Sequence, residues 1–258
     1  MNTKNNFTII IPARFGSSRL PGKPLIEIHG KPMIIRVVEQ AIMSYAKRVI
    51  VATDHPEIFN IVKQKNYEVC MTKNIHCSGT ERISEVINKY KFSDEEIIIN
   101  LQGDEPLINP KLINKIAKNT LLNKYDLVTL ATKIINPKDI SNTNIVKVIV
   151  NKDNNAIYFS RTAIPWQDNK SSKHILKINK EYLRHIGIYG YSAGFIREYN
   201  KWPQCSLEKI ENLEQLRVLW NAKIIHVIRT SCNYLHSVDN QSDLEYVRKN
   251  FLILSKHK

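Results

Sequence analysis

Three cationic side chains lie close together near the start of the chain, in a segment rich in glycine and proline that runs from Pro12 to Leu25. They are Arg14, Arg19 and Lys23. Arginine can hold a phosphate through two N–H groups at once, and lysine acts as a mobile point charge. Because glycine also lets backbone approach a ligand closely, the segment predicts a polyphosphate site.

Two well-known phosphate-binding loops do not fit this segment. A Walker A loop reads GxxxxGK[ST], but here the interval from Gly16 to Gly22 is one residue too long, and Pro24 stands where the magnesium-binding hydroxyl belongs. A GxGxxG motif is absent from the sequence, so a dinucleotide-binding fold is unsupported. Taken alone, the segment could also be an ordinary basic connection between a strand and a helix.

Two aspartates are candidate metal ligands. Asp104 follows a short apolar run that is typical of a buried strand, and Asp239 precedes the last expected helix. Mg²⁺ is usually held by one or two carboxylates together with phosphate oxygens, so Asp104 and Asp239 are predicted to bind it. The alternatives stay open at this point: Asp104 could shape a turn after Gly103, and Asp239 could cap the helix.

The spacing of three polar residues in the second half of the chain predicts a polar stripe along one helix. If the helix expected over Leu207–Trp220 is continuous, Glu208, Glu211 and Gln215 lie within a stripe of roughly 60°. Carboxylate and amide groups suit a ligand with many hydroxyls, because carboxylates accept hydrogen bonds from them. A solvated outer face of the helix is the alternative.

The elements that must position these residues alternate along the first half of the chain. Apolar runs predict strands, and helices are expected to begin with Pro32, Pro56 and Pro110 as first residues, and after a cap at Thr80. The expected strands lie at residues 7–11, 49–52, 67–71 and 97–101. This alternation is typical of βαβ units, and it predicts an α/β fold with a mostly parallel sheet. The basic segment and Asp104 both follow strands, so they are expected at the carboxyl edge, where such sheets bind ligands.

The second half is less regular. We expect a hairpin turning at Asp153-Asn154, a polar loop over residues 165–180, and a capping box from Ser242 to Glu245 that opens the last helix. The remaining expected elements are strands at 144–150, 156–160, 186–191 and 224–228 and helices at 193–202 and 207–220. The prediction is one domain over residues 1–258, with a β-rich excursion at about 150–200.

Composition narrows the class of protein. The chain of 258 residues contains no apolar run near the ~20 residues needed to span a bilayer. The stretch Phe7–Ile11 is too short for a secretory signal, so we expect a cytoplasmic protein without a membrane partner. The four cysteines lack zinc-type spacing and are expected to be free thiols.

The net charge of +14 raises the question of nucleic-acid binding. The lysines are spread along the whole chain, and no basic face with interleaved aromatic residues is evident. We therefore expect no nucleic-acid partner, although the excess charge favours anionic small substrates.

Seven segments spread over nearly the whole chain carry a recognisable pattern, in order and at regular spacing: residues 10–25, 51–54, 77–82, 100–106, 158–166, 183–191 and 207–217. Together they resemble the cytidylyltransferases that act on 3-deoxy-D-manno-octulosonate (Kdo). The opening motif is shared partly with sialic acid cytidylyltransferases, whereas the blocks Arg184–Tyr189 and Leu213–Arg217 are more particular to the Kdo enzymes. One departure is Ser237, where the family usually has glycine.

The resemblance implies a Rossmann-like nucleotidyltransferase fold and a magnesium-dependent enzyme that transfers CMP from CTP to Kdo. The products would be CMP-Kdo, for lipopolysaccharide synthesis, and pyrophosphate. It also implies a homodimer with the excursion at its interface. The same chemistry on another acid sugar, such as N-acetylneuraminate, is the nearest alternative.

The resemblance further assigns roles to single residues. Arg14, Arg19 and Lys23 would hold the triphosphate, and Asp104 and Asp239 the magnesium ion. The cytosine would be recognised by backbone around Pro12 and Ala13 and by the loop at Ser78. The sugar site would be lined by Gln102, Arg161, His185, Tyr189, Glu211 and Gln215, with Arg161 facing the Kdo carboxylate.

Overall fold

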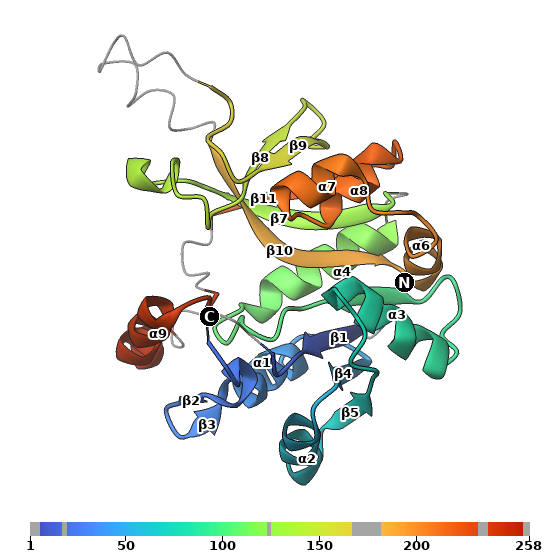
Figure 1. The fold of residues 1–258 in the computed structure, drawn as a ribbon, viewed down its shortest axis with the longest axis vertical. Coiled ribbons are helices and arrows are strands. Elements are labelled where there is room, and N and C mark those ends of the chain that lie inside the picture. The colour runs from blue at the N-terminus through green and yellow to red at the C-terminus, as the bar shows by residue number, and fades with distance from the viewer. Residues whose placement is uncertain (1–5, 17–19, 123–124, 167–181, 232–236, 255–258) are drawn as a thin grey trace. The chain divides into compact units, whose positions relative to one another are not determined.

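The computed structural model describes residues 6–16, 20–122, 125–166, 182–231 and 237–254. The chain divides into two compact units. Unit 1 comprises Met1–Leu122, Gly190–Asn200 and Tyr234–Lys258, and unit 2 comprises Asn123–Tyr189 and Lys201–Asn233. Helices alternate with mostly parallel strands, which confirms the predicted α/β class (Figure 1).

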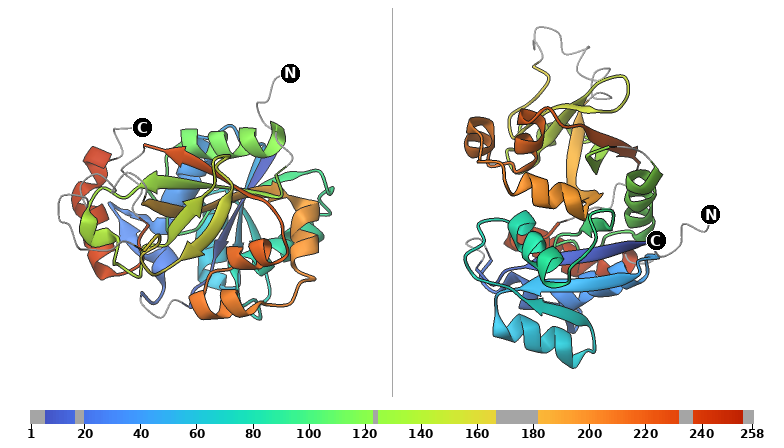
Figure 2. Two further views of the ribbon diagram at one scale, coloured as in Figure 1. Left: turned by 90° about the horizontal axis from the view of Figure 1, so that it is seen from above. Right: turned by 90° about the vertical axis from the view of Figure 1, so that its right-hand side faces the viewer.

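Unit 1 contains a parallel sheet in the order β6-β1-β4-β5. Its strands are β1 (Phe7–Ala13), β4 (Arg48–Thr53), β5 (Glu68–Met71) and β6 (Ile97–Asn100), all at positions that the apolar runs predicted. The right-hand view of Figure 2 shows β1 and β4 running side by side. Every residue of β6 is buried, as expected of a strand covered on both faces.

Six helices belong to unit 1 among the described residues. β1 contacts both α1 and α3, and its consecutive residues Ile9, Ile10 and Ile11 are fully buried, so helices cover both faces of this strand. The helices are α1 (Met33–Ile42), α2 (Pro56–Gln64), α3 (Gly79–Lys89), α4 (Pro110–Leu122), α6 (Ala193–Tyr199) and α9 (Gln241–Leu254). The short elements η1 (Lys23–Leu25), β2 (Glu27–Ile28) and β3 (Lys31–Pro32) connect β1 to α1.

The starts of two helices differ from the predictions. Pro32 is the N-cap of α1, not its first helical residue. The cap of α3 is Ser78 and not Thr80: the Ser78 hydroxyl accepts the N–H of Glu81, and the Glu81 carboxylate accepts the N–H of Cys77. This reciprocal pair is a variant of the capping box: it satisfies the N–H of Glu81 in the first turn and the N–H of Cys77 directly before the cap.

The last helix also begins earlier than predicted. The side chain of Asn240 accepts the N–H of Asp243, and the Asp243 carboxylate accepts the N–H groups of Asn240 and Asp239. The capping box therefore involves Asn240 and Asp243, two residues ahead of Ser242 and Glu245. Since Asn240 is the cap, the Asp239 carboxylate is not needed for that purpose.

Unit 2 has both parallel and antiparallel strands. β7 (Leu127–Lys133) pairs parallel with β11 (Ile225–Thr230). β8 (Lys147–Val150) pairs antiparallel with β9 (Ala156–Ser160), which confirms the predicted hairpin. β8 also pairs antiparallel with β10 (Leu183–Ser192), whose residues 183–189 belong to this unit. A short helix η2 (Pro137–Asp139) follows β7, and most of the predicted polar loop at 165–180 lies outside the described residues.

The helix predicted over residues 207–220 is two helices, α7 (Ser206–Glu211) and α8 (Gln215–Trp220) (Figure 1). The break lies at Asn212, which adopts a left-handed conformation with φ 52° and ψ 50°. This break allows Arg217 to form an ion pair with Glu208 through two hydrogen bonds, from Nε to Oε2 at 2.7 Å and from Nη2 to Oε1 at 2.5 Å. In one continuous helix these residues would point about 180° apart. The predicted stripe was therefore wrong, and Glu208 is a buried structural acid.

Among the described residues, no helix has both the length and the apolar character required to cross a bilayer. Cys70, Cys77 and Cys205 are free thiols, as predicted. The fourth cysteine, Cys232, lies outside the described residues.

Candidate functional site

The ammonium group of Lys23 is the centre of a charged cluster in unit 1. Its Nζ donates hydrogen bonds to Asp104 Oδ2 at 2.6 Å and to the carbonyl oxygen of Val238 at 2.8 Å. Asp239 Oδ1 lies 3.7 Å from the same nitrogen. The structure thus brings together three residues that are far apart in the sequence and that were predicted to share one site.

The register of the parallel strands explains why Lys23 meets Asp104. Ile10 of β1 lies opposite Asn100 of β6, so the segments that follow these strands leave the sheet at the same edge. Gly103 allows the two segments to touch: a β-carbon there would lie 3.1 Å from the carbonyl oxygen of Pro12. Gly22 provides a left-handed turn with φ 65° directly before Lys23, a conformation that glycine adopts without strain.

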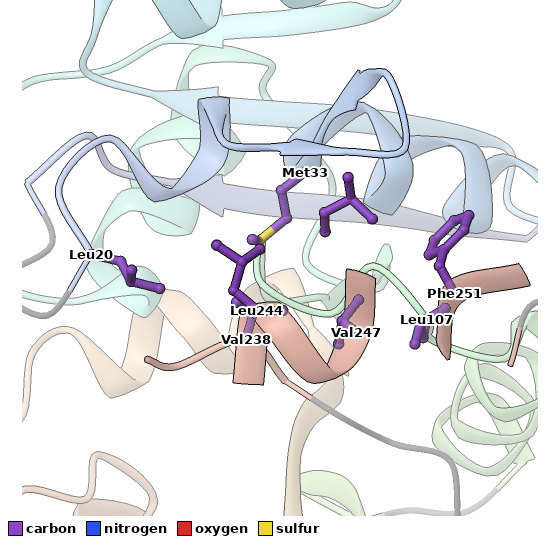
Figure 3. Close-up of a cluster of buried hydrophobic side chains, with 8 residues drawn as sticks. Leu20, Met33, Leu107, Val238, Leu244, Val247 and Phe251 are labelled. Carbon is purple, nitrogen blue, oxygen red and sulfur yellow. The ribbon is translucent and has the colours of Figure 1, made fainter. Parts of the chain in front are cut away.

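Asp239 is positioned by hydrophobic packing. α9 contributes Leu244, Val247 and Phe251 to a buried cluster that also holds Val238, the neighbour of Asp239 (Figure 3). The N–H of Val238 donates to the carbonyl oxygen of Asp104 at 2.9 Å. The other members of the cluster are Leu20, Ile28, Met33 and Leu107. This packing and the backbone bond hold Asp239 beside Lys23.

The two carboxylates fit a magnesium ion. Both approach one cationic nitrogen, and their side chains are 24% and 33% exposed for Asp104 and Asp239 respectively, so solvent reaches them. Magnesium takes few protein ligands and completes its shell with phosphate oxygens and water. In the part of the chain that the structure describes, no three His, Cys, Asp or Glu residues form a metal-binding group. The carboxylates at this cluster are those of Asp104 and Asp239. The hydroxyl of Ser237 lies 3.5 Å from Asp239 Oδ2.

The residues predicted to contact the nucleotide lie at the end of β1 and just after it. Pro12 and Ala13 are the last residues of the strand, and Arg14 is exposed immediately beyond it. Arg19 lies outside the described residues.

The start of α3 lies against the end of β1. A β-carbon at Gly79 would lie 3.3 Å from Pro12 Cγ, and it would approach Gln102 Nε2 at 4.0 Å. Ser78, predicted to lie in the cytosine loop, uses its hydroxyl to cap α3. Gln102 donates a hydrogen bond to Asn100 Oδ1 at 2.9 Å.

A buried ion pair joins two further segments of the family resemblance. Arg82 is 3% exposed, and its guanidinium donates to Asp54 Oδ2 at 2.6 Å. Asp54 follows β4 and Arg82 lies in the first turns of α3, so the pair ties this helix to the sheet. The residues in these two segments that resemble the family therefore include a structural ion pair.

In unit 2, Arg161 and Glu211 are held together. Arg161 donates through Nε to the carbonyl oxygen of Glu211 at 2.9 Å, and through its terminal nitrogens to the carbonyl oxygens of Thr143 and Asn212. The Glu211 carboxylate accepts the Ser160 hydroxyl at 2.6 Å and the N–H of Arg161 at 2.9 Å. These bonds fix the plane of the guanidinium group.

Sequence reasoning missed Lys147, which is fully buried. Its ammonium donates to the carbonyl oxygens of Asn142 at 3.0 Å, Ile145 at 2.6 Å and Arg161. Burial lowers the pKa of Lys147, and the charge of Glu211 opposes that shift. A lysine flanked by valines in an apolar strand is the signal that could have revealed this internal cation.

His185 and Tyr189 lie near each other on β10, with ring centroids 5.5 Å apart. The imidazole also packs edge-on against Phe159, and its Nε2 lies 3.1 Å from Thr129 Oγ1. Burial, aided by the charge of Arg184, lowers the pKa of His185 to about 3. Burial raises the pKa of Tyr189 above its usual value, so this pair is uncharged at neutral pH.

Gln215 is the first residue of α8 and is 5% exposed. Its Nε2 is buried and has no hydrogen-bond partner among the described residues. An unpaired buried donor is costly, and a ligand oxygen would satisfy it. The structure therefore places Arg161, His185, Tyr189, Glu211 and Gln215 in unit 2, and Gln102 in unit 1.

Comparisons with known proteins identify the family to which the chain is similar. A family model described as "Cytidylyltransferase" matches residues 8–225. A 3-deoxy-manno-octulosonate cytidylyltransferase of Proteus mirabilis is 51% identical over 97% of this chain and 99% of its own length. One from Histophilus somni is 50% identical over 94% of this chain and 97% of its own length.

Solved structures extend the comparison. A CMP:2-keto-3-deoxy-manno-octonic acid synthetase complexed with CTP superimposes with a TM-score of 0.85 at 37% identity, over 96% of this chain and 99% of that one. A cytidylyltransferase from Leptospira borgpetersenii shares the fold at a TM-score of 0.62 and 16% identity, over 96% and 87% of the two chains. The predicted nucleotidyltransferase fold is thus confirmed, and the chain belongs to the 3-deoxy-manno-octulosonate cytidylyltransferase family.

Proposed function

We propose that this chain transfers CMP from CTP to Kdo and releases pyrophosphate, with Mg²⁺ as cofactor. The observation that carries the proposal is that the Lys23 ammonium lies close to both the Asp104 and the Asp239 carboxylate, at 2.6 and 3.7 Å. A cation beside two hard-oxygen donors suits a triphosphate that arrives with a divalent metal. The relatives named above support Kdo as the acceptor. The product, CMP-Kdo, would serve lipopolysaccharide synthesis.

Each group then has a role in the proposed reaction. Lys23, with Arg14 and Arg19, binds the triphosphate, and Asp104 and Asp239 hold the magnesium ion. The backbone at Pro12 and Ala13 and the Ser78 loop recognise the cytosine. The sugar is bound by Gln102, Arg161, His185, Tyr189, Glu211 and Gln215.

The chemistry is a displacement at phosphorus. The anomeric hydroxyl oxygen of Kdo forms a bond to the α-phosphorus of CTP, and the bond from that phosphorus to the bridging oxygen breaks. Pyrophosphate leaves with the electron pair, and the hydroxyl proton passes to solvent. The protein contributes mainly positioning and charge stabilisation, with Lys23 neutralising the departing pyrophosphate. Bound magnesium would supply Lewis-acid polarisation of phosphate oxygens.

The test is pyrophosphate release in the presence of Mg²⁺. We expect release with CTP and Kdo, and little with ATP, GTP or UTP. N-Acetylneuraminate serves as the competing acid sugar. Faster release with N-acetylneuraminate than with Kdo would identify a different acceptor, and no release with CTP and any acid sugar would refute the function.

Asp239→Asn tests the second metal ligand. The amide keeps the shape but loses the charge, so we expect a higher Mg²⁺ concentration for half-maximal activity. Asp153→Asn, at an exposed position of the β8–β9 turn, is the matched control and should leave the magnesium titration unchanged. If Asp239→Asn titrates like the wild type, Asp239 has a structural role.

Arg161→Ala tests the sugar site. Loss of one charge-assisted contact should raise the KM for Kdo by about 10–100-fold and leave the KM for CTP nearly constant. Arg229→Ala, which removes an exposed arginine of β11, is the control. Equal increases in both KM values would show that Arg161 was assigned to the wrong substrate.

The chain is further proposed to act in the cytoplasm as a homodimer with residues at about 150–200 in the interface. Two large apolar side chains of this stretch support an interface, since Ile157 is 58% exposed and Trp166 is 83% exposed. Light scattering on the purified chain should give the mass of a dimer, and a monomer mass would refute that part.

A further inference from the structure

The buried hydroxyl of Thr129, on β7, lies within hydrogen-bond distance of three groups. Its Oγ1 is 3.1 Å from His185 Nε2, 3.1 Å from the carbonyl oxygen of Ile186 and 2.8 Å from that of Ile188. Thr129 is fully buried, and all four residues belong to unit 2. Because a hydroxyl has one proton and two lone pairs, these contacts determine where the protons lie.

The two carbonyl oxygens can only accept hydrogen bonds. If the hydroxyl proton pointed to His185, Oγ1 would face the oxygen of Ile188 at 2.8 Å with no proton between them. Two such oxygens repel each other, whereas a proton directed at a carbonyl makes a normal hydrogen bond. The hydroxyl therefore donates to the backbone of β10, and Oγ1 accepts the Nε2–H of His185.

The imidazole ring holds a single proton at neutral pH. Burial lowers the pKa of His185 to about 3, so the ring stays uncharged well below pH 7. If Nε2 carries that proton, then Nδ1 is unprotonated and can only accept a hydrogen bond.

We infer that Thr129 is a positioning residue that fixes His185 as the Nε2–H tautomer, so that Nδ1 accepts a hydrogen bond from a hydroxyl group of the acid sugar. This inference rests on the proposed function, because it takes the sugar as the ligand of His185.

The inference also separates the roles of two groups in unit 2. An unprotonated nitrogen attracts a sugar hydroxyl but repels a carboxylate, because lone pairs would face each other. The carboxylate of the acid sugar must then bind a cationic group, and Arg161 has the fixed guanidinium plane that suits it. His185 thus selects for a hydroxyl, and Arg161 for the acid.

The first experiment reads the tautomer directly and needs no substrate. Two-bond ¹H–¹⁵N NMR correlations of the ¹⁵N-histidine-labelled full chain distinguish Nε2–H from Nδ1–H, and His185→Gln assigns the signal by removing it. We expect Nε2–H in the wild type at pH 7. An Nδ1–H or doubly protonated ring would overturn the inference, even if the enzyme is fully active.

The second experiment uses a matched pair of substitutions. Thr129→Val keeps the shape and removes the hydroxyl, while Thr129→Ser keeps the hydroxyl. We expect Thr129→Val to raise the KM for Kdo roughly tenfold, the scale of one hydrogen bond, with the KM for CTP within about twofold. Thr129→Ser should resemble the wild type in both KM values and in the NMR signal.

An unchanged KM for Kdo in Thr129→Val would contradict the inference. If Thr129→Val does not fold, the inference is tested by the KM values of Thr129→Ser and by the histidine NMR spectrum of the wild type. A chain that shows Nε2–H but no activity on any acid sugar would refute the proposed function and leave the tautomer assignment standing.

Discussion

Lys23→Ala should lower kcat by about 10²–10³, the usual effect of losing a group that stabilises charge in the transition state. The reason is the geometry of its ammonium group, which is anchored by Asp104 and the carbonyl oxygen of Val238 and lies beside Asp239. In the proposed reaction this group neutralises the pyrophosphate as it departs. Steady-state pyrophosphate release at saturating CTP and Kdo measures the effect.

The control for this prediction is Lys111→Ala, which removes an exposed lysine from the first turn of α4 in the same unit. It should retain wild-type kcat. Asp104→Ala should show a loss similar to that of Lys23→Ala, since it removes both the lysine's partner and a metal ligand. Near-normal turnover in Lys23→Ala, with the fold intact by circular dichroism, would remove Lys23 from the mechanism.

Glu208→Leu should reduce the free energy of unfolding by about 3–5 kcal/mol, the cost of leaving a buried charge without its partner. Glu208 and Arg217 each expose only 5% of their side chains, and two hydrogen bonds join them. The pair spans the break between α7 and α8, which carry Glu211 and Gln215. Urea unfolding, followed by circular dichroism, measures the change.

A double variant separates the ion pair from simple packing. Glu208→Leu with Arg217→Met removes both charges, so most of the lost stability should return. If the geometry of α7 and α8 depends on the ion pair, the same double variant should still raise the KM for Kdo. A loss below about 1 kcal/mol in Glu208→Leu would mean that the pair behaves like an exposed one, contrary to its burial.

The sheet and the Lys23–Asp104 contact could be predicted because local patterns determine them. Short apolar runs such as the three isoleucines at residues 97–99 of β6 mark buried strands. Parallel strands also place their following segments at one edge, which brings the basic segment to Asp104. The strands are predicted from residues that are neighbours in the sequence, and the Lys23–Asp104 contact from a general rule of sheet topology.

The details that could not be predicted depend on contacts between distant residues. The spacing of Leu213, Leu216 and Trp220 is compatible with one long helix. The break at Asn212 goes together with the pairing of Glu208 and Arg217, which lie nine residues apart. The position of Asp239 likewise depends on the packing of α9, which no local pattern around Asp239 indicates.

Two buried polar residues of unit 2 were missed for the same reason. Lys147 and Thr129 lie in apolar strands, and their partners are backbone carbonyl oxygens that leave no mark in the sequence. A polar residue inside an apolar strand indicates a buried polar contact. The partner in that contact becomes known only from a structure that shows which strand lies beside it.

The central claim is that Lys23, Asp104 and Asp239 form one site for a metal-bound triphosphate. The most direct test is a crystal structure of this chain grown with CTP and Mg²⁺. We expect the metal between the two carboxylates and the phosphate oxygens, with Lys23 Nζ in contact with the phosphates. Density for the triphosphate elsewhere, with Lys23 still bonded only to Asp104 and Val238, would contradict it.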